Sequence, residues 1–373
     1  MKSEILWFIL GAISSLIINL ISPPIYNKLR LRILKIIRLF KTRKSITLIL
    51  GPSLPKQKMK IGELELDFFV LQYANYKPSL IQATYTDNCK PLIKEFEALK
   101  NNLIDDINRR KKQGEFGLPY NGSTYKLLKF EVGNREIING EELPILQLAF
   151  GPTDYFTQLI TDLNIKNPIR NKFASKYNLL ERPVSEFASI LGINFNLITN
   201  DGYLIITRRS STVNINRGIY HTSVAENLLR PTDGDANGAP NLFNCARRGI
   251  QEEIGISVDI EDIQFTTFGV YPPWCQYKII GWSEIKETKK EVEFIHSIAV
   301  AKDKWENNEL IFVPCNPKSI AEFISQTIDD WYDIGLACVI FSLFQVGHPI
   351  KDIQTAFLKI KKGNPLNTTP NNV

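Results

Sequence analysis

Residues 245–256 combine side chains that could bind a metal ion. Their sequence is CARRGIQEEIGI, in which Arg248 precedes the adjacent pair Glu252 and Glu253. Positions three and four apart share one face of a helix, so Gly249 and both glutamates would lie together. Neighbouring carboxylates repel each other unless a cation offsets their charge, and Mg²⁺ prefers oxygen ligands. The alternative is an ordinary surface helix, in which Arg248 pairs with Glu252 and Glu253 is solvated.

The elements that must position this helix are typical of an α/β domain. Asn200, Asp201 and Gly202 form a turn signal between two β-rich runs, because such residues tolerate positive φ. The expected elements, in chain order, are two strands within 193–210, a loop to 244, a helix ended by Gly255, strands at 258–271 and 275–285, and helices within 320–347. This order predicts a mixed sheet with helices packed on it.

The segment from residue 234 to 256 resembles the Nudix box. The residues that match it in register are Gly234, Arg248, Ile250, Glu252, Glu253, Gly255 and Ile256. The resemblance extends over about residues 190–330 and implies a Nudix-like mixed-sheet α/β/α sandwich. It also implies that Glu252 and Glu253 hold Mg²⁺ or Mn²⁺, that Arg248 orients these carboxylates, and that the ligand is a nucleotide-type small molecule.

Two positions depart from the box. Its first glutamate falls on Pro240 and its second on Gly249, so one carboxylate is lost from the predicted metal-binding face. Glu226, Asp233 and Asp235 in the preceding loop could supply an oxygen ligand or could be solvated acids. Two functions therefore stay open. One is metal-dependent hydrolysis of a nucleoside diphosphate linked to another group, and the other is a catalytically impaired nucleotide-binding or scaffold module.

Three aromatic residues near the predicted sheet allow two interpretations. Tyr271, Trp274 and Trp282 could stack on a nucleobase, or they could pack in the core. The sequence favours core packing for each of them, because large aromatic side chains supply much of the buried apolar area of a domain.

The N-terminal segment is predicted to anchor the chain in a membrane. Residues 5–27 contain no charged side chain, and a helix of that length spans about 35 Å, enough for a hydrocarbon core of about 30 Å. Residues 28–44 carry eight lysines and arginines and no acid, which keeps that side cytoplasmic. A cleaved signal peptide fits less well, because its positive charge would come first. We therefore expect one span within residues 1–27, with the N-terminus outside and the soluble body in the cytoplasm.

Composition limits the remaining possibilities. The net charge is +6, and because Lys2 and Glu4 cancel, the 329 residues after position 44 sum to 6 − 8 = −2. A body that is not basic argues against general nucleic-acid binding. The five cysteines lie far apart with no CxxC pair, which argues against a zinc site or a disulfide framework and fits reduced thiols.

The predicted organisation has five parts. Leu29, Ile33, Ile36, Ile37 and Phe40 fall on one helical face of the basic segment, which could rest on an anionic leaflet or simply continue the anchor helix. Residues 61–190 lack a chemical motif, and we expect a strand at 64–73, a helix within 91–112 and a hairpin turning at Gly133-Asn134. The parts are a transmembrane helix (1–27), a basic juxtamembrane segment and linker (28–60), a mixed α/β region (61–190), a Nudix-like domain (191–362) and a disordered tail (363–373).

Overall fold

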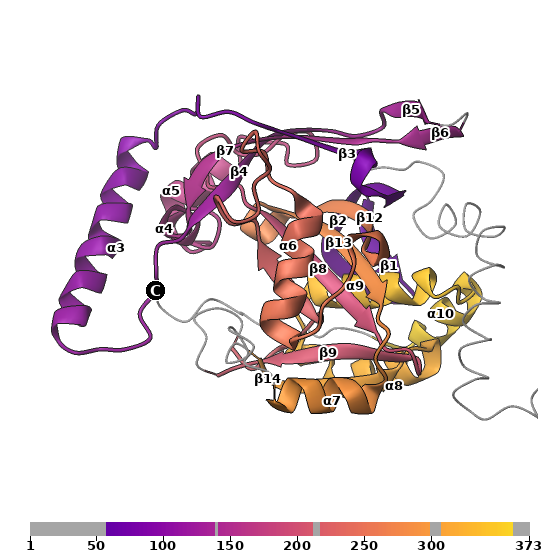
Figure 1. The fold of residues 1–373 in the computed structure, drawn as a ribbon. Coiled ribbons are helices and arrows are strands. Elements are labelled where there is room, and N and C mark those ends of the chain that lie inside the picture. Colours follow the sequence, from indigo (N-terminus) through magenta and orange to yellow (C-terminus); the bar gives the residue numbers. More distant parts are fainter. Residues whose placement is uncertain (1–56, 139–140, 212–216, 299–306, 361–373) are drawn as a thin grey trace, which may run out of the picture.

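The computed structural model describes residues 57–138, 141–211, 217–298 and 307–360. Figure 1 shows a mixed α/β body with helix α3 at one end and strand β1 toward the other. The predicted membrane span, the basic segment and the predicted tail lie outside the described residues. Within the described ranges, no helix has the length and apolar character needed to cross a bilayer.

The central sheet joins strands from both sides of residue 190. Across the described ranges its order is β1-β2-β12-β13-β8-β9-β10, with β11 also paired to β8 and β14 to β9. Neighbouring strands are antiparallel except β8 and β13, which are parallel. The strands are β1 (Gln57–Ile61), β2 (Leu64–Tyr76), β8 (Leu191–Ile198), β9 (Tyr203–Arg209), β10 (Tyr220–His221), β11 (Val224–Asn227), β12 (Gln264–Tyr271), β13 (Gln276–Glu284) and β14 (Asn307–Pro314).

Two smaller sheets lie outside the central one. One has the order β3 (Ile81–Tyr85), β7 (Leu146–Asp154), β4 (Ser123–Glu131), and the other pairs β5 (Arg135–Ile138) with β6 (Glu141–Pro144). The hairpin predicted at Gly133-Asn134 is wrong, because β4 pairs with β7 while β5 pairs with β6. Leu127 and Phe130 of β4 are buried in the same core as Leu242 and Phe243 of α6, which holds this strand against the body.

Helices cover both faces of the central sheet. Those described are α3 (Lys94–Lys112), α4 (Tyr155–Ile160), α5 (Pro168–Ala174), α6 (Leu242–Gly249), α7 (Lys289–Ile298), α8 (Pro317–Thr327), α9 (Asp333–Gln345) and α10 (Ile350–Phe357). Short 3₁₀ turns occur at Pro78–Leu80, Ile260–Asp262, Pro272–Trp274 and Ile328–Asp330. The helix predicted within 91–112 and the strand predicted at 64–73 are confirmed as α3 and β2.

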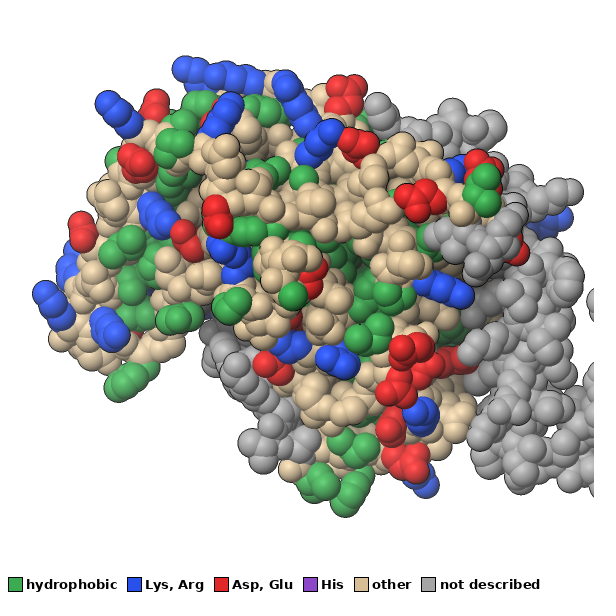
Figure 2. All heavy atoms as spheres, turned by 45° about the horizontal axis from the view of Figure 1, so that its top comes forward, with side chains coloured by type: hydrophobic (Ala, Val, Ile, Leu, Met, Phe, Trp, Pro, Cys, Tyr) green, Lys and Arg blue, Asp and Glu red, His purple; other side chains and the backbone are tan. Residues whose placement is uncertain are grey.

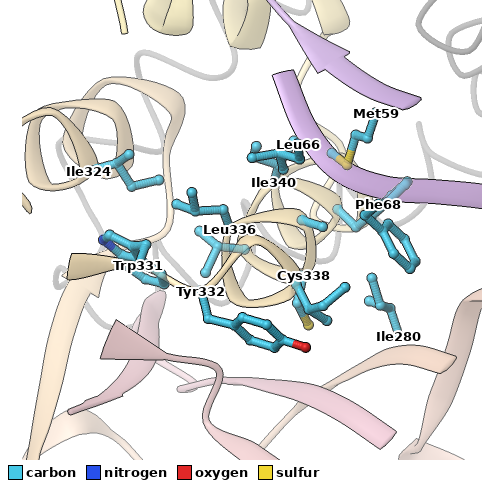
Figure 3. Close-up of a cluster of buried hydrophobic side chains, with 14 of the residues drawn as sticks. Met59, Leu66, Phe68, Ile280, Ile324, Trp331, Tyr332, Leu336, Cys338 and Ile340 are labelled. Carbon is cyan, nitrogen blue, oxygen red and sulfur yellow. The ribbon is translucent and has the colours of Figure 1, made fainter. Parts of the chain in front are cut away.

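Alternation along β13 creates two cores. Tyr277 and Ile279 point into the core beneath α6, whereas Ile280 and Trp282 point into the core that contains α9. Every residue of α9 is buried, so this apolar helix is packed on all sides rather than along one stripe. Figure 3 shows part of its surroundings, with Leu336 and Cys338 among other buried side chains.

Candidate functional site

Helix α6 carries the residues that the sequence singled out. Asn241 begins it, because the Asn241 side-chain oxygen accepts hydrogen bonds from the backbone N–H groups of Phe243 and Asn244, both at 3.0 Å. After Gly249 the helix widens into a π-helical turn, Ile250–Ile254. The predicted end at Gly255 is confirmed, and this glycine adopts φ +88°, which favours a residue without a Cβ.

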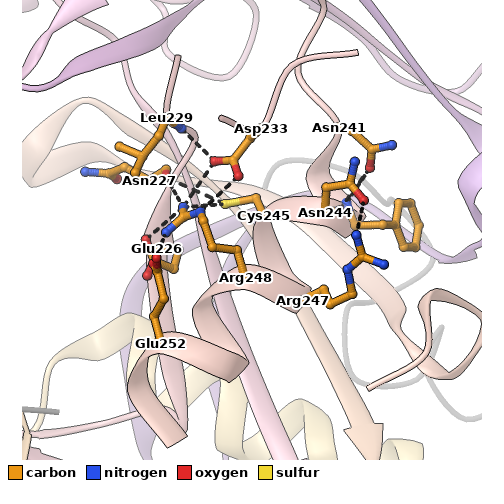
Figure 4. A network of polar contacts seen from close by, with 11 residues as sticks. Glu226, Asn227, Leu229, Asp233, Asn241, Asn244, Cys245, Arg247, Arg248 and Glu252 are labelled. Atoms are coloured by element: carbon orange, nitrogen blue, oxygen red, sulfur yellow. Dashed lines mark hydrogen bonds and ion pairs between the residues drawn. The ribbon is translucent and has the colours of Figure 1, made fainter. Parts of the chain in front are cut away.

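Arg248 lies at the centre of a group of carboxylates. Its guanidinium donates to Asp233 (Nε to Oδ1, 3.0 Å) and to Glu252 (Nη1 to Oε2, 2.7 Å). It also donates to Glu226 (Nη2 to Oε2, 3.2 Å). We call these four residues the Arg248 cluster, and Figure 4 shows the three carboxylates arranged around the guanidinium. The predicted i,i+4 pair between Arg248 and Glu252 is therefore present, but the helix that carries it is not an ordinary surface helix.

The cluster is largely removed from solvent. The side chains of Arg248, Glu226 and Glu252 are 13%, 14% and 20% exposed. Burial disfavours the charged guanidinium, but the hydrogen bonds to Asp233 and the charge of Glu226 outweigh it and raise the pKa of Arg248 above its ordinary value. The arginine therefore remains a cation, and its fork of donors fits several carboxylates at once.

Asp233 ties the loop before α6 to the helix. Its side chain is 1% exposed, and its Oδ2 accepts a hydrogen bond from the Leu229 backbone N–H at 2.7 Å. The Asn241 N–H donates to the Asp233 carbonyl at 2.7 Å, which links the loop to the start of α6. A buried carboxylate of this kind requires a partner, and Arg248 provides it. The sequence named Asp233 as a loop acid that could supply an oxygen ligand or be solvated, and the structure instead pairs it with Arg248.

Glu253 lies against the neighbouring strand. It is 4% exposed, and its Oε1 accepts a hydrogen bond from the Ala225 backbone N–H of β11 at 3.1 Å. The sequence left open whether Glu253 is solvated. The structure instead buries it and uses its carboxylate to join the π-helical turn to β11.

Gly249 leaves room for a side chain from β11. A Cβ added at Gly249 would lie 2.5 Å from Glu226 Cγ, 3.3 Å from Glu226 Cδ and 2.8 Å from Val224 Cγ1. The side chain of Glu226 therefore fills the space that a residue at 249 would need. A strand carboxylate thus lies where the box predicts a helix carboxylate. The sequence named Glu226 as a possible oxygen donor but placed it in a loop, whereas it lies on β11.

The donor set, as placed, does not fit a divalent cation. In the parts of the chain that the structure describes, no three Asp, Glu, His or Cys side chains are grouped so that they could hold a metal ion. Glu252 bonds Arg248, and Glu253 bonds the Ala225 backbone. Mg²⁺ and Mn²⁺ bind through carboxylate oxygens together with waters, and here one oxygen of each glutamate is directed to a protein partner instead of a shared cation position.

The remaining predicted residues lie apart from the cluster. Asp235 accepts hydrogen bonds from two backbone N–H groups of its own loop, which makes it a turn-stabilising residue. Trp274 stacks on Tyr332 with ring centroids 4.9 Å apart, and Tyr271 meets both rings edge-on. Trp282 belongs to the same core on the α9 side of the sheet. These aromatic residues therefore pack in the core, on the opposite face from α6.

Comparisons with solved structures give distant likenesses. One is to DR0079 from Deinococcus radiodurans, at 14% identity and TM-score 0.27, covering 37% of this chain and 73% of that one. Another is to a bifunctional NMN adenylyltransferase/ADP ribose pyrophosphatase from Francisella tularensis, at 11% identity and TM-score 0.29. This second match covers 43% of this chain and 42% of that one, so it spans less than half of that protein. No protein-family model and no curated protein sequence matches the chain.

Proposed function

We propose that residues 191–362 form a Nudix-like module that binds a nucleotide-type ligand or acts as a scaffold at the membrane, without hydrolysing its ligand. The segment within residues 1–27 would anchor it as a single span, with the N-terminus outside and the body in the cytoplasm. The proposal rests on the box residues that match in register and on the two that do not.

The observation that carries the proposal is the arrangement of the box acids. The acid at position 249 is absent, and its space is filled by Glu226. Glu252 and Glu226 both bond Arg248, while Glu253 bonds β11. Admitting a metal would break these bonds and leave the buried arginine short of partners. Loss of one partner of a buried ion pair costs about 3–5 kcal/mol of stability. The acids therefore support a stabilising role better than a catalytic one.

A turnover and binding experiment tests this function. The full chain, purified in detergent, is incubated with Mn²⁺ or Mg²⁺ and a panel of nucleoside diphosphates linked to a sugar or to a second nucleoside. We expect no turnover above that of a Glu253→Gln variant, and a rise in the melting temperature with at least one nucleotide. Metal-dependent turnover that the variant lacks would overturn the proposal.

One observation favours the second candidate, a metal-dependent pyrophosphohydrolase. The carboxylate of Glu226 reaches the place beside Gly249 that the motif assigns to an acid. A hydrolase built this way would lose turnover in Glu226→Gln as completely as in Glu252→Gln. A binding module would show no turnover in the unsubstituted chain, in Glu226→Gln or in Glu252→Gln.

A further inference from the structure

The loop after α3 presents two aromatic side chains to solvent. We call residues 109–122 the α3 tip, since they comprise the last turn of α3 and the loop that follows. Phe116 is 94% exposed and Tyr120 is 84% exposed. Isolated apolar side chains on a surface are ordinary, but two nearly bare aromatic rings in one loop are not explained by packing.

The tip has a defined shape despite this exposure. Gly114 and Gly117 adopt φ +80° and +72°, values that favour glycine, and these two residues flank the segment that carries Phe116. Arg110 donates to Glu115 (Nε to Oε2, 2.7 Å) at the start of the loop. At its end, the Asn121 side chain accepts from the Phe156 N–H at 2.8 Å. The rings are therefore held outward by a loop fixed at both ends.

The tip is also the site of a concentrated positive charge. Arg109, Arg110, Lys111 and Lys112 end α3, and Glu115 is the acid of the tip, so residues 109–122 sum to 4 − 1 = +3. Arg109 and Arg110 also pair with Asp106 one turn earlier, so Lys111 and Lys112 are the cations of the tip best placed to meet an external anion. The 329 residues after position 44 sum to −2, so that stretch without the tip carries −2 − 3 = −5. Figure 2 shows lysine and arginine side chains, with apolar ones and some acids among them, at the end of the molecule formed by α3. The α3 tip therefore combines positive charge and exposed aromatic rings on a body of net negative charge, and this combination favours contact with an anionic surface.

We propose that the α3 tip is a second membrane contact, at which Phe116 and Tyr120 enter the headgroup region of an anionic leaflet. The adjacent lysines and arginines would lie beside lipid phosphates, whose negative charge attracts them. The ring of Tyr120 is amphipathic and therefore favoured at that depth, whereas the apolar ring of Phe116 gains by leaving water. The proposal rests on the proposed membrane attachment of this chain.

The position of the tip gives the second contact a consequence. Figure 1 places α3 at one end of the body and β1, which the chain enters from the predicted anchor, toward the other. Residues 45–56 precede β1, and twelve residues can extend to about 40 Å. A tether at one end and an inserted loop at the other would hold the long dimension of the body along the bilayer. The inserted tip and the tether together would then limit how far the Arg248 cluster can move from the lipid.

Tryptophan substitution in the full chain tests the contact. Phe116→Trp and the control Ile137→Trp, at a residue 79% exposed on β5, are reconstituted into vesicles with or without 30% phosphatidylserine. Because the chain already contains five tryptophans, the signal is the tryptophan emission of each variant minus that of the unsubstituted protein. We expect Phe116→Trp to shift to the blue and to be quenched at least twofold by brominated acyl chains when phosphatidylserine is present, while the control shows neither change.

Two further measurements separate the possible failures. Lys111→Glu combined with Lys112→Glu should abolish the phosphatidylserine dependence of quenching at position 116. Equal quenching at positions 116 and 137 in both lipid mixtures would overturn the proposal, and the tip would then be assigned to contact with a protein. Sedimentation of the unsubstituted chain with vesicles is measured separately. Failure to sediment with any vesicle would overturn the membrane attachment as well as the tip contact.

Discussion

The two faces of the central sheet treat buried polar groups differently. On the α6 face, Arg248 and its three carboxylates are joined by hydrogen bonds of 2.7 to 3.2 Å. On the α9 face, Asn194 Oδ1, Gln276 Nε2 and the Tyr332 hydroxyl are neutral buried atoms without a hydrogen-bond partner within the described residues, and the Tyr76 hydroxyl in the core beneath α6 also lacks one there. Lys278 lies on the same face as Gln276, two residues further along β13, and among the described residues it has no salt bridge.

The difference shows where each face obtains its stability. An unsatisfied buried polar group costs about 1–3 kcal/mol, which a face can tolerate only if apolar packing is extensive. The α9 face has that packing, since α9 is buried over its entire length. The α6 face has charged groups that could not be buried without one another, so its stability depends on the arginine. Four substitutions distinguish the two faces, and they are taken here from the largest expected effect to the smallest.

Replacing Arg248 with methionine should have the largest effect. It leaves Asp233, which is 1% exposed, without its guanidinium, and loss of one partner of a buried ion pair costs about 3–5 kcal/mol. Urea unfolding of the detergent-solubilised chain measures the loss. Arg247→Met is the matched control, because Arg247 is exposed and bonds Asn244 at 3.4 Å. Equal losses for both variants would remove the basis for the cluster's structural role.

Restoring the motif acid should destabilise the protein. In Gly249→Glu, the new Cβ would lie 2.5 Å from Glu226 Cγ, and overpacking of this kind costs about 1–3 kcal/mol. Shortening the opposing residue relieves the clash, so Gly249→Glu combined with Glu226→Gly should be more stable than the sum of the single changes predicts. A double-mutant cycle measures this coupling. Strictly additive losses would mean that Glu226 does not occupy the space of residue 249.

Lys278 should make stability depend on pH. Burial lowers the pKa of Lys278 to about 8, partly opposed by the charge of Asp162, whereas the unfolded side chain has its ordinary pKa of 10.5. Between these values the unfolded chain binds the proton and the folded chain does not, so stability rises with pH. Solvent screening of this partly exposed side chain reduces the gain to about 1 kcal/mol from pH 8 to 9.5. Melting temperatures across that range should rise, and Lys278→Met should remove the rise; an identical pH profile in the variant would contradict the assignment.

Removing the Tyr332 hydroxyl should have the smallest effect. Because that oxygen has no hydrogen-bond partner among the described residues, Tyr332→Phe should change the free energy of unfolding by less than about 0.5 kcal/mol or stabilise the protein slightly. Tyr277→Phe is the control on the other face, since the Tyr277 hydroxyl donates to the Leu179 carbonyl at 2.7 Å. The control should lose about 1 kcal/mol. A larger loss at position 332 would show that its hydroxyl is satisfied.

Local patterns predicted much of this fold because they act over a few residues. The helix end at Gly255 and the β8–β9 turn at Gly202, with φ +88° and +85°, follow from the preference of glycine for positive φ. The strand-like composition of residues 258–271 and 275–285 likewise predicted β12 and β13, although β12 begins only at Gln264, after a 3₁₀ turn. The predicted pair Arg248–Glu252 is local to one helix face, and the structure confirms it.

Long-range relationships could not be read from the chain. The replacement of residue 249 by Glu226 depends on the register of β11 against β8, where Glu226 opposes Ile193. The pairing of β2 with β12 joins residues about two hundred positions apart, and nothing in either strand specifies the other. The turn at Gly133-Asn134 was correct as a turn signal but wrong as a hairpin, because strand partners are chosen by burial in the assembled core.

The position of β1 has a mechanical consequence. It is the outermost strand on its side of the central sheet, and its free end at Gln57 pairs with Val70 of β2. Tension on the chain before residue 57 would break the backbone hydrogen bonds between β1 and β2 one after another, starting at Gln57. A shear force would instead load all of these bonds at once. If the chain is tethered, the edge strand would yield at a small force and act as an extensible link, which protects the rest of the sheet from pulling at the lipid.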